Sequence, residues 1–210
     1  MIHLYAFACG LRELPPDADV ECVQIGGMSA VVGRIADGDR CDSHDDVVRH
    51  GLVVEALVER ADGVLPARFG ERFTDIEALE RAVSARSVEL ERRLRDMRGC
   101  VELAVRVGRT SRDVQRDGLD GASYLRARYR ATAEDAAAVS ELHAALQLRA
   151  RATAVSEQVA GSLLHDAGYL VGRHEIDEFA RDVDAYASRH PEHTVVCTGP
   201  WAPSSFAGAA

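Results

Sequence analysis

Short apolar runs separated by turn residues occupy the beginning of the chain. Residues 2–8 (IHLYAFA), 20–25 (VECVQI) and 28–35 (MSAVVGRI) are rich in β-branched and aromatic side chains, and a Gly26–Gly27 pair divides the last two runs. Runs of this kind bounded by glycine are typical of strands joined by tight turns. The pattern therefore predicts three strands before residue 36.

Helical spacing follows these strands. Ser43 precedes Asp46 by three residues, which is a capping-box pattern at a helix start. The predicted inner face of this first helix is made of Val47, Gly51, Val54 and Val58.

Thr74 and Glu77 have the same relation at the start of a second predicted helix, which is amphipathic and about six turns long. Gly99 ends it. Its apolar positions recur at steps of three, four or seven residues: Ile76, Leu79, Val83, Leu90, Leu94 and Met97.

The rest of the chain alternates between the two periods. A strand pattern at 100–107 (CVELAVRV) precedes a long helical stretch from about Leu119 to Ala150, with Leu125, Val139, Leu142 and Leu146 at helical spacing. Two extended pieces follow, at 152–158 and 167–173. After them come a helix with Ile176, Phe179, Val183 and Tyr186 on one stripe and a last strand at 193–199. This β-α-β-β-α-β order is that of a ferredoxin-like domain.

Together these patterns predict an α+β protein of two small domains. Residues 1–98 form an N-terminal α+β domain with three short strands and two helices. Residues 99–210 form a ferredoxin-like domain that ends in an apolar tail.

Composition narrows the class of protein. The 210 residues carry a net charge of −9. Residues 81–116 are the exception, because they contain 10 arginines and 5 acidic residues and so carry a net positive charge. An acidic chain is a poor general binder of nucleic acid, so a solvated helix face is the favoured interpretation of that segment. No apolar run approaches the length of a membrane span. Five scattered cysteines without a CxxC motif, and no recognisable secretory leader, predict reduced thiols in a cytoplasmic protein.

Motifs for catalysis or metal binding are weak. GxSxG, Walker and GxGxxG patterns are absent. Ser162, His165 and Asp166 are too close in sequence to form a triad from separate elements. His190 and His193 are close enough to share an ion, but a surface loop is favoured, and the loop with Asp37 and Asp39 departs from a calcium loop. We expect no catalytic residues, no metal and no cofactor.

One segment, residues 63–73 (GVLPARFGERF), combines apolar, arginine and aromatic side chains around a Pro and a Gly. It suits either a connection between helices with buried rings, which residue chemistry alone favours, or a recognition edge, since arginine and aromatic residues are frequent anchors of interfaces.

This segment and the end of the chain carry a family resemblance. GVLPARFGERF lies between HGLVVEALVE and MRGCVELAVRV, and the chain finishes with GYLVGRHEIDEFARDVDAYASRHPEHTVVCTGPWAPSSF. In order and spacing, from HLYAFA to Phe206, the sequence resembles the gas vesicle GvpF/GvpL family.

The resemblance implies a non-enzymatic accessory protein and minor component of gas vesicles, cytoplasmic before assembly. Its implied partners are the small hydrophobic shell protein GvpA and possibly other accessory proteins, with neither nucleic acid nor membrane. It would bind GvpA, limit its aggregation and support nucleation and assembly. The candidate contact or supporting residues are Val64, Leu65, Arg68, Phe69, Arg72, Phe73, Trp201, Pro203 and Phe206.

Two alternatives from other classes stay open. A ferredoxin-like scaffold hosts many functions, so the chain could be a small-molecule-binding protein or an enzyme. Nucleic-acid binding through residues 81–116 is a third interpretation, and it predicts salt-sensitive retention on heparin.

Overall fold

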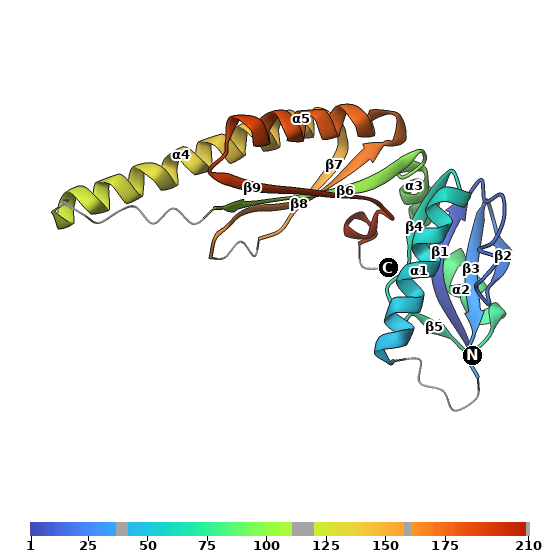
Figure 1. Ribbon diagram of the computed structural model, residues 1–210. Helices are drawn as coiled ribbons and strands as arrows, with labels where there is room; N and C mark the ends of the chain where they lie inside the picture. Colours follow the sequence, from blue (N-terminus) through green and yellow to red (C-terminus); the bar gives the residue numbers. More distant parts are fainter. Residues whose placement is uncertain (37–41, 111–119, 158–160, 209–210) are drawn as a thin grey trace. The chain divides into compact units, whose positions relative to one another are not determined.

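The computed structural model describes residues 1–36, 42–110, 120–157 and 161–208 and divides into two compact units. The N-terminal unit comprises residues 1–102 and 200–210, and the C-terminal unit comprises residues 103–199 (Figure 1). The apolar tail, expected within the domain 99–210, is thus grouped with the N-terminal unit. The possible calcium loop with Asp37 and Asp39 lies outside the described residues.

The N-terminal unit is built on one antiparallel sheet. The three predicted strands are confirmed as β1 (Ile2–Cys9), β2 (Glu21–Ile25) and β3 (Met28–Arg34). Two further strands, β4 (Gly63–Pro66) and β5 (Arg72–Phe73), both pair with β1, and the sheet order is β2-β3-β1-β4.

Helix α1 (His44–Arg60) begins at the predicted capping box. The hydroxyl of Ser43 accepts a hydrogen bond from the backbone N–H of Asp46 at 3.2 Å, and the Asp46 carboxylate accepts one from the N–H of Ser43 at 3.0 Å. The predicted inner face was partly wrong. Val47 and Gly51 are exposed, and the buried stripe is instead His50, Val53, Val54, Leu57 and Val58. The polar His50 can face inward because His3 and the carbonyl of Ala67 satisfy its ring nitrogens.

The second predicted helix is two helices, α2 (Ile76–Ser84) and α3 (Ser87–Asp96). Its N-cap is Asp75, whose carboxylate accepts from the N–H of Ala78 at 2.8 Å, and not Thr74 as expected. Arg86 leaves the helical region with φ −126° and ψ 11°. The apolar residues between Val83 and Leu90 are Ala85 and Val88, and both are exposed, so the segment near the break lacks the core contacts that hold the two helices.

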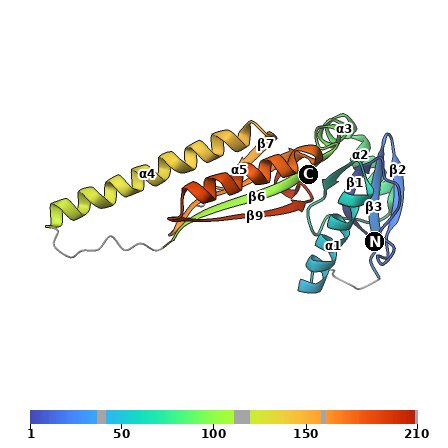
Figure 2. The same cartoon turned by 45° about the horizontal axis from the view of Figure 1, so that its top comes forward.

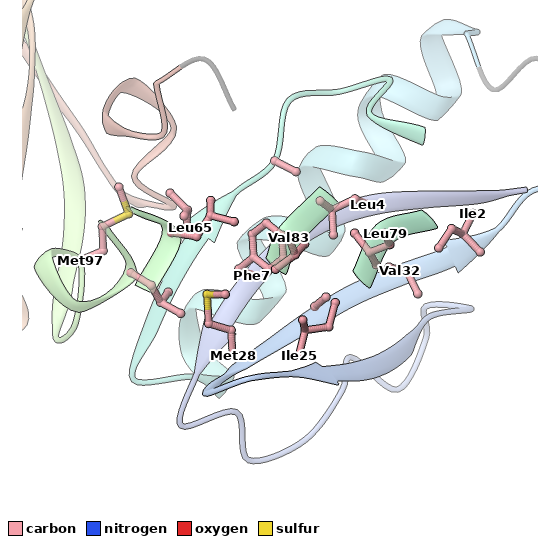
Figure 3. Packing of buried hydrophobic residues seen from close by; sticks show 14 residues of the cluster. Ile2, Leu4, Phe7, Ile25, Met28, Val32, Leu65, Leu79, Val83 and Met97 are labelled. Atoms are coloured by element: carbon pink, nitrogen blue, oxygen red, sulfur yellow. The ribbon is translucent and has the colours of Figure 1, made fainter. Parts of the chain in front are cut away.

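Both faces of the sheet are covered. Figure 3 shows Ile2, Leu4 and Phe7 of β1 packed with Leu79 and Val83 of α2 in a core that also takes in Leu90 and Leu94 of α3. On the opposite face, His3 and Tyr5 contact the ring of His50 of α1. This explains why β1 is buried at nearly every position instead of alternating.

The C-terminal unit has the predicted element order. It consists of β6 (Cys100–Arg109), α4 (Gly121–Gln147), β7 (Ala150–Val155), β8 (Leu163–Gly172), a 3₁₀ turn (Arg173–Glu175), α5 (Ile176–Arg189) and β9 (His193–Trp201). The strands lie in the order β7-β8-β6-β9, and both helices cover one face of the sheet (Figures 1 and 2).

The predicted helix stripes of this unit are confirmed where they meet the sheet. Val139, Leu142 and Leu146 of α4 and Phe179, Val183 and Tyr186 of α5 pack against β6 and β8. Leu125 was wrongly assigned to the stripe. It lies in the N-terminal half of α4, which extends past the sheet in Figure 2, and it is exposed.

Among the described helices, none has both the length and the apolar character needed to cross a bilayer.

Candidate functional site

The segment from Gly63 to Phe73 pairs with β1 at both of its ends, and its middle residues leave the strand. The N–H of Ala67 donates to the carbonyl of Tyr5 at 2.9 Å, and the carbonyl of Glu71 accepts from the N–H of Leu4 at 3.0 Å. The residues between these two bonds form a turn that projects away from the strand.

The turn is closed by a hydrogen bond of 3.1 Å from the N–H of Glu71 to the carbonyl of Arg68. Gly70, its third residue, has a φ of 87°, a conformation that glycine adopts without strain. The backbone thus presents Arg68 and Phe69 outside the sheet.

The candidate residues of this segment fall into two groups. Val64 and Leu65 are buried, with exposed fractions of 3% and 2%, and Phe73 is half-buried against the core. Arg68 and Arg72 are exposed, and Phe69 is half-buried. The first group lies beneath the turn, and the second group reaches the surface.

Phe69 is held by a cluster of rings. Its ring centroid lies 5.8 Å from that of His3 and 5.7 Å from that of His50, and Tyr5 lies 5.4 Å from His50. Nε2 of His3 lies 2.8 Å from Nδ1 of His50, and Nε2 of His50 lies 3.1 Å from the carbonyl oxygen of Ala67. Since a carbonyl only accepts, His50 carries its proton on Nε2, and His3 donates to Nδ1 of His50.

Both histidines of this cluster are neutral at pH 7. Burial lowers the pKa of His3 to about 4, helped by repulsion from His50 and Arg72. Burial also lowers the pKa of His50, against the hydrogen bond to Ala67. At pH 7 the cluster therefore supports Phe69 without carrying a charge.

The C-terminal tail packs back onto the N-terminal unit. The N–H of Ala202 donates to Glu55 of α1 at 2.9 Å, and Ser205 donates its N–H at 2.9 Å and its hydroxyl at 2.6 Å to Glu102. Phe206 packs against the core of this unit, where Arg93 donates to its carbonyl oxygen at 3.4 Å.

The remaining tail candidates differ in exposure. Pro203 is buried, whereas Trp201 is 46% exposed. Burial raises the pKa of Glu55, the hydrogen bond from Ala202 opposes this change, and the neighbouring Glu102 adds to it. Two carboxylates in a partly dry environment therefore fix the tail in place.

These two segments meet along one groove. It has a volume of about 560 Å³, and its walls come from α1, the projecting turn and the tail. The lining residues are His50, Gly51, Val54, Glu55, Pro66, Ala67, Arg68, Phe69, Ser204, Ser205, Ala207 and Gly208. Of the residues predicted from sequence, Arg68 and Phe69 line the groove directly, and the tail contributes the neighbours of Pro203 and Phe206.

A second groove, of about 540 Å³, lies between α1 and residues 15–20. Its wall includes Val48 and Leu52, which are 46% and 66% exposed. None of the sequence-predicted interaction residues lines it.

Ser162, His165 and Asp166, which sequence spacing argued against as a triad, have separate roles. His165 bonds the hydroxyl of Tyr169 at 2.9 Å, and Asp166 pairs with Arg106 at 3.1 Å. The carbonyl of Ser162 accepts from the N–H of Arg109 at 2.7 Å.

The sequence analysis did not identify His50 and Glu55, which line the groove, or Glu102, which binds the tail together with Glu55. His50 carries a usable signal, because it lies one turn before Val54 on the apolar stripe of α1. Glu102 interrupts a strand that is buried around it, which marks a carboxylate with a partner. Glu55 has no such signal in the sequence.

Comparison with known proteins supports one family. The model of the family described as "Gas vesicle synthesis protein GvpL/GvpF" matches residues 2–208. Gas vesicle protein F2 of Halobacterium salinarum is 28% identical over 187 residues, which cover 88% of this chain and 78% of the relative. Gas vesicle protein F of Haloferax mediterranei is 29% identical over 188 residues, covering 85% and 77%.

Solved structures share the fold. The crystal structure of GvpF from Anabaena sp. PCC7120 has a TM-score of 0.79 at 15% identity, covering 100% of this chain and 96% of the other. GvpF from Microcystis aeruginosa has a TM-score of 0.73 at 18% identity, covering 98% of both chains.

Proposed function

Because the chain belongs to the GvpL/GvpF family of gas vesicle proteins, we propose that it is a minor, non-enzymatic component that binds the shell protein GvpA. In this role it limits aggregation of GvpA and supports nucleation and assembly of the vesicle. We place its site of action at gas vesicles and in the cytoplasm before assembly, with other accessory proteins as further partners.

The observation that carries the proposal is the convergence of two segments on one groove. The turn with Arg68 and Phe69 and the tail around Phe206 are far apart in sequence, yet both belong to the N-terminal unit and border the same 560 Å³ groove. Sequence chemistry and family resemblance single out the same two segments.

The chemistry of the groove suits a partner segment that offers both apolar and polar groups. Val54, Pro66 and Ala67 are buried apolar residues beside it, and Phe69 is held rigidly by the histidine cluster. An aromatic anchor beside charged and polar side chains is typical of protein interfaces. An unassembled shell protein with exposed apolar surface would be shielded by docking there.

The test is co-expression with tagged GvpA, followed by pull-down and measurement of the soluble GvpA fraction. Arg68→Glu reverses the charge at the rim, and Phe69→Ala removes the ring. Arg95→Glu, at an exposed position of α3 that does not line the groove, is the matched control. We expect the first two variants to lose GvpA while the control retains it, with all three folded by circular dichroism.

Leu52→Glu changes the second groove and distinguishes failure of the proposed binding site from failure of the proposed function. If it alone abolishes capture, GvpA binds the second groove and the site proposal fails while the function stands. If the folded wild-type protein neither captures nor solubilises GvpA, the function proposal fails, and titration with small ligands becomes the next test of the ligand-binding alternative.

A further inference from the structure

Residues 190–193 (HPEH) form a tight turn between α5 and β9 in the C-terminal unit. The N–H of His193 donates to the carbonyl of His190 at 2.9 Å, and Pro191 holds the second position, where its fixed φ suits such a turn. The turn places Nδ1 of His190 3.0 Å from Oε1 of Glu192. Within the described part of the chain, donor atoms of His190, Glu192 and His193 lie within 4.8 Å of one another.

A carboxylate holds one ring nitrogen of His193 and so fixes the orientation of the ring, as is usual for metal-binding histidines. Its side chain is fully buried, and its Nε2 lies 3.0 Å from a carboxylate oxygen of Asp135. Nε of Arg109 donates to the other oxygen of Asp135 at 2.6 Å. A carboxylate paired with arginine accepts, so the proton of His193 resides on Nε2 and Nδ1 carries a lone pair.

Tyr186 at present uses that lone pair. Its hydroxyl donates to Nδ1 of His193 at 2.7 Å. Because the proton of His193 is on Nε2, which faces Asp135, the phenol is the donor in this bond. The hydroxyl is the group that an ion would displace.

We propose that His190, Glu192 and His193 bind a divalent transition-metal ion of the zinc type. Two imidazole nitrogens and one carboxylate oxygen are a zinc donor set, and water fills the fourth position. The ion joins the end of α5 to the start of β9. This site lies outside the groove of the N-terminal unit and does not depend on binding of GvpA.

Binding requires a small local rearrangement. Zinc–ligand distances of about 2.0–2.2 Å are shorter than the present spacing allows. The rings of His190 and His193 lie 19° from parallel with centroids 5.5 Å apart, so His190 must turn to direct its lone pair at the ion. His190 follows the last turn of α5 and is half-buried, which leaves it room to turn.

The experiment is calorimetric titration of the full-length, untagged, reduced protein with zinc chloride after removal of metals by a chelator. Cobalt absorption in the visible range reports the geometry. We expect one ion per chain. His190→Ala and Glu192→Gln should each weaken binding at least about tenfold, and Asp135→Asn by about 10–100-fold.

Tyr186→Phe gives the opposite expectation. It removes the competing hydroxyl while keeping the ring, so zinc should bind at least as tightly as in the wild type. A merely structural cluster would show no such ordering of Tyr186→Phe against His190→Ala.

Two controls distinguish this site from general surface binding. His174 is exposed and lies 3.6 Å from Glu175, and among the described residues this pair belongs to no group of three possible ligands. Cys197 is an exposed free thiol on β9. His174→Ala and Cys197→Ser should leave affinity unchanged. The proposal is overturned if either control abolishes binding, if His190→Ala binds like the wild type, or if the wild type does not bind zinc at micromolar concentrations.

Discussion

The carboxylate of Glu55 on α1 accepts a hydrogen bond of 2.9 Å from the backbone N–H of Ala202, 147 residues later in the chain. This bond and the two from Ser205 to Glu102 return the C-terminal tail to the N-terminal unit. They complete one wall of the groove.

Removing this anchor should loosen the tail. In Glu55→Ala, the N–H of Ala202 loses its charged acceptor, and a hydrogen bond to a charged group contributes about 1.5–3 kcal/mol before solvent screening reduces it. Trp201, the single tryptophan, directly precedes Ala202 and reports the change. We expect a red shift of its emission and stronger acrylamide quenching than in the wild type.

Glu59→Ala is the control for this experiment, because Glu59 is exposed one turn further along the same helix. If both variants quench alike, the bond between Glu55 and Ala202 does not hold the tail.

Alanine at two glycines should act in opposite directions. Gly70 has a φ of 87° in the turn, and a Cβ there would meet no atom within 4 Å, so Gly70→Ala tests backbone strain alone. We expect a loss of about 1–2 kcal/mol in the free energy of unfolding. Gly51 lies inside α1 with equally open surroundings, and Gly51→Ala should gain up to about 1 kcal/mol.

Urea denaturation of both variants decides the point. A neutral effect of Gly70→Ala would mean that the turn relaxes to a different backbone conformation. GvpA capture by this variant would then show whether Phe69 needs the observed turn.

Much of the fold could be predicted because its signals are local. The capping box at Ser43, the turn at Gly26–Gly27 and the stripe from Phe179 to Tyr186 each follow from neighbours within a few residues. The β-α-β-β-α-β order came from these periodicities alone, and the strand order β7-β8-β6-β9 requires the pairing seen in the structure.

The groove could not be predicted in the same way, because its parts meet through long-range pairing. β5 has two residues and exists because Ile2 pairs with Phe73, which no local pattern reveals. The position of His50 on α1 can be read from the sequence, but its partners, His3 and the carbonyl of Ala67, come from distant parts of the chain. Leu125 was assigned to the buried stripe wrongly because the helical pattern of α4 continues past the end of the sheet, where none of the described strands covers the helix.

The hydroxyl of Tyr169 should be important for the C-terminal unit. It lies 2.8 Å from Nδ1 of His143 and 2.9 Å from Nε2 of His165, and the tyrosine is fully buried. Tyr169→Phe leaves the buried His165 without this partner, which costs about 1–3 kcal/mol. Tyr129→Phe, at a position that is 80% exposed on α4, should change stability by less than about 0.5 kcal/mol. Equal denaturation midpoints for the two variants would contradict the assigned role.

Acid should destabilise the N-terminal unit through His3. Its pKa is lowered to about 4 by burial, with repulsion from His50 and Arg72, whereas the unfolded chain has a value of 6.5. Between these values the unfolded state binds a proton that the folded state does not, so stability falls as pH falls through this window. The loss for one such group is at most about 1.4 kcal/mol per pH unit.

The comparison with His3→Gln isolates this contribution. Glu55 and Glu71, whose pKa values burial raises, favour the folded state on acidification, but they are present in both proteins and cancel in the difference. Urea denaturation from about pH 7 to pH 4.5 should give a flatter stability profile for His3→Gln than for the wild type. His174→Gln, at an exposed position, should keep the wild-type slope, and equal slopes for all three proteins would show that His3 is not the titrating group.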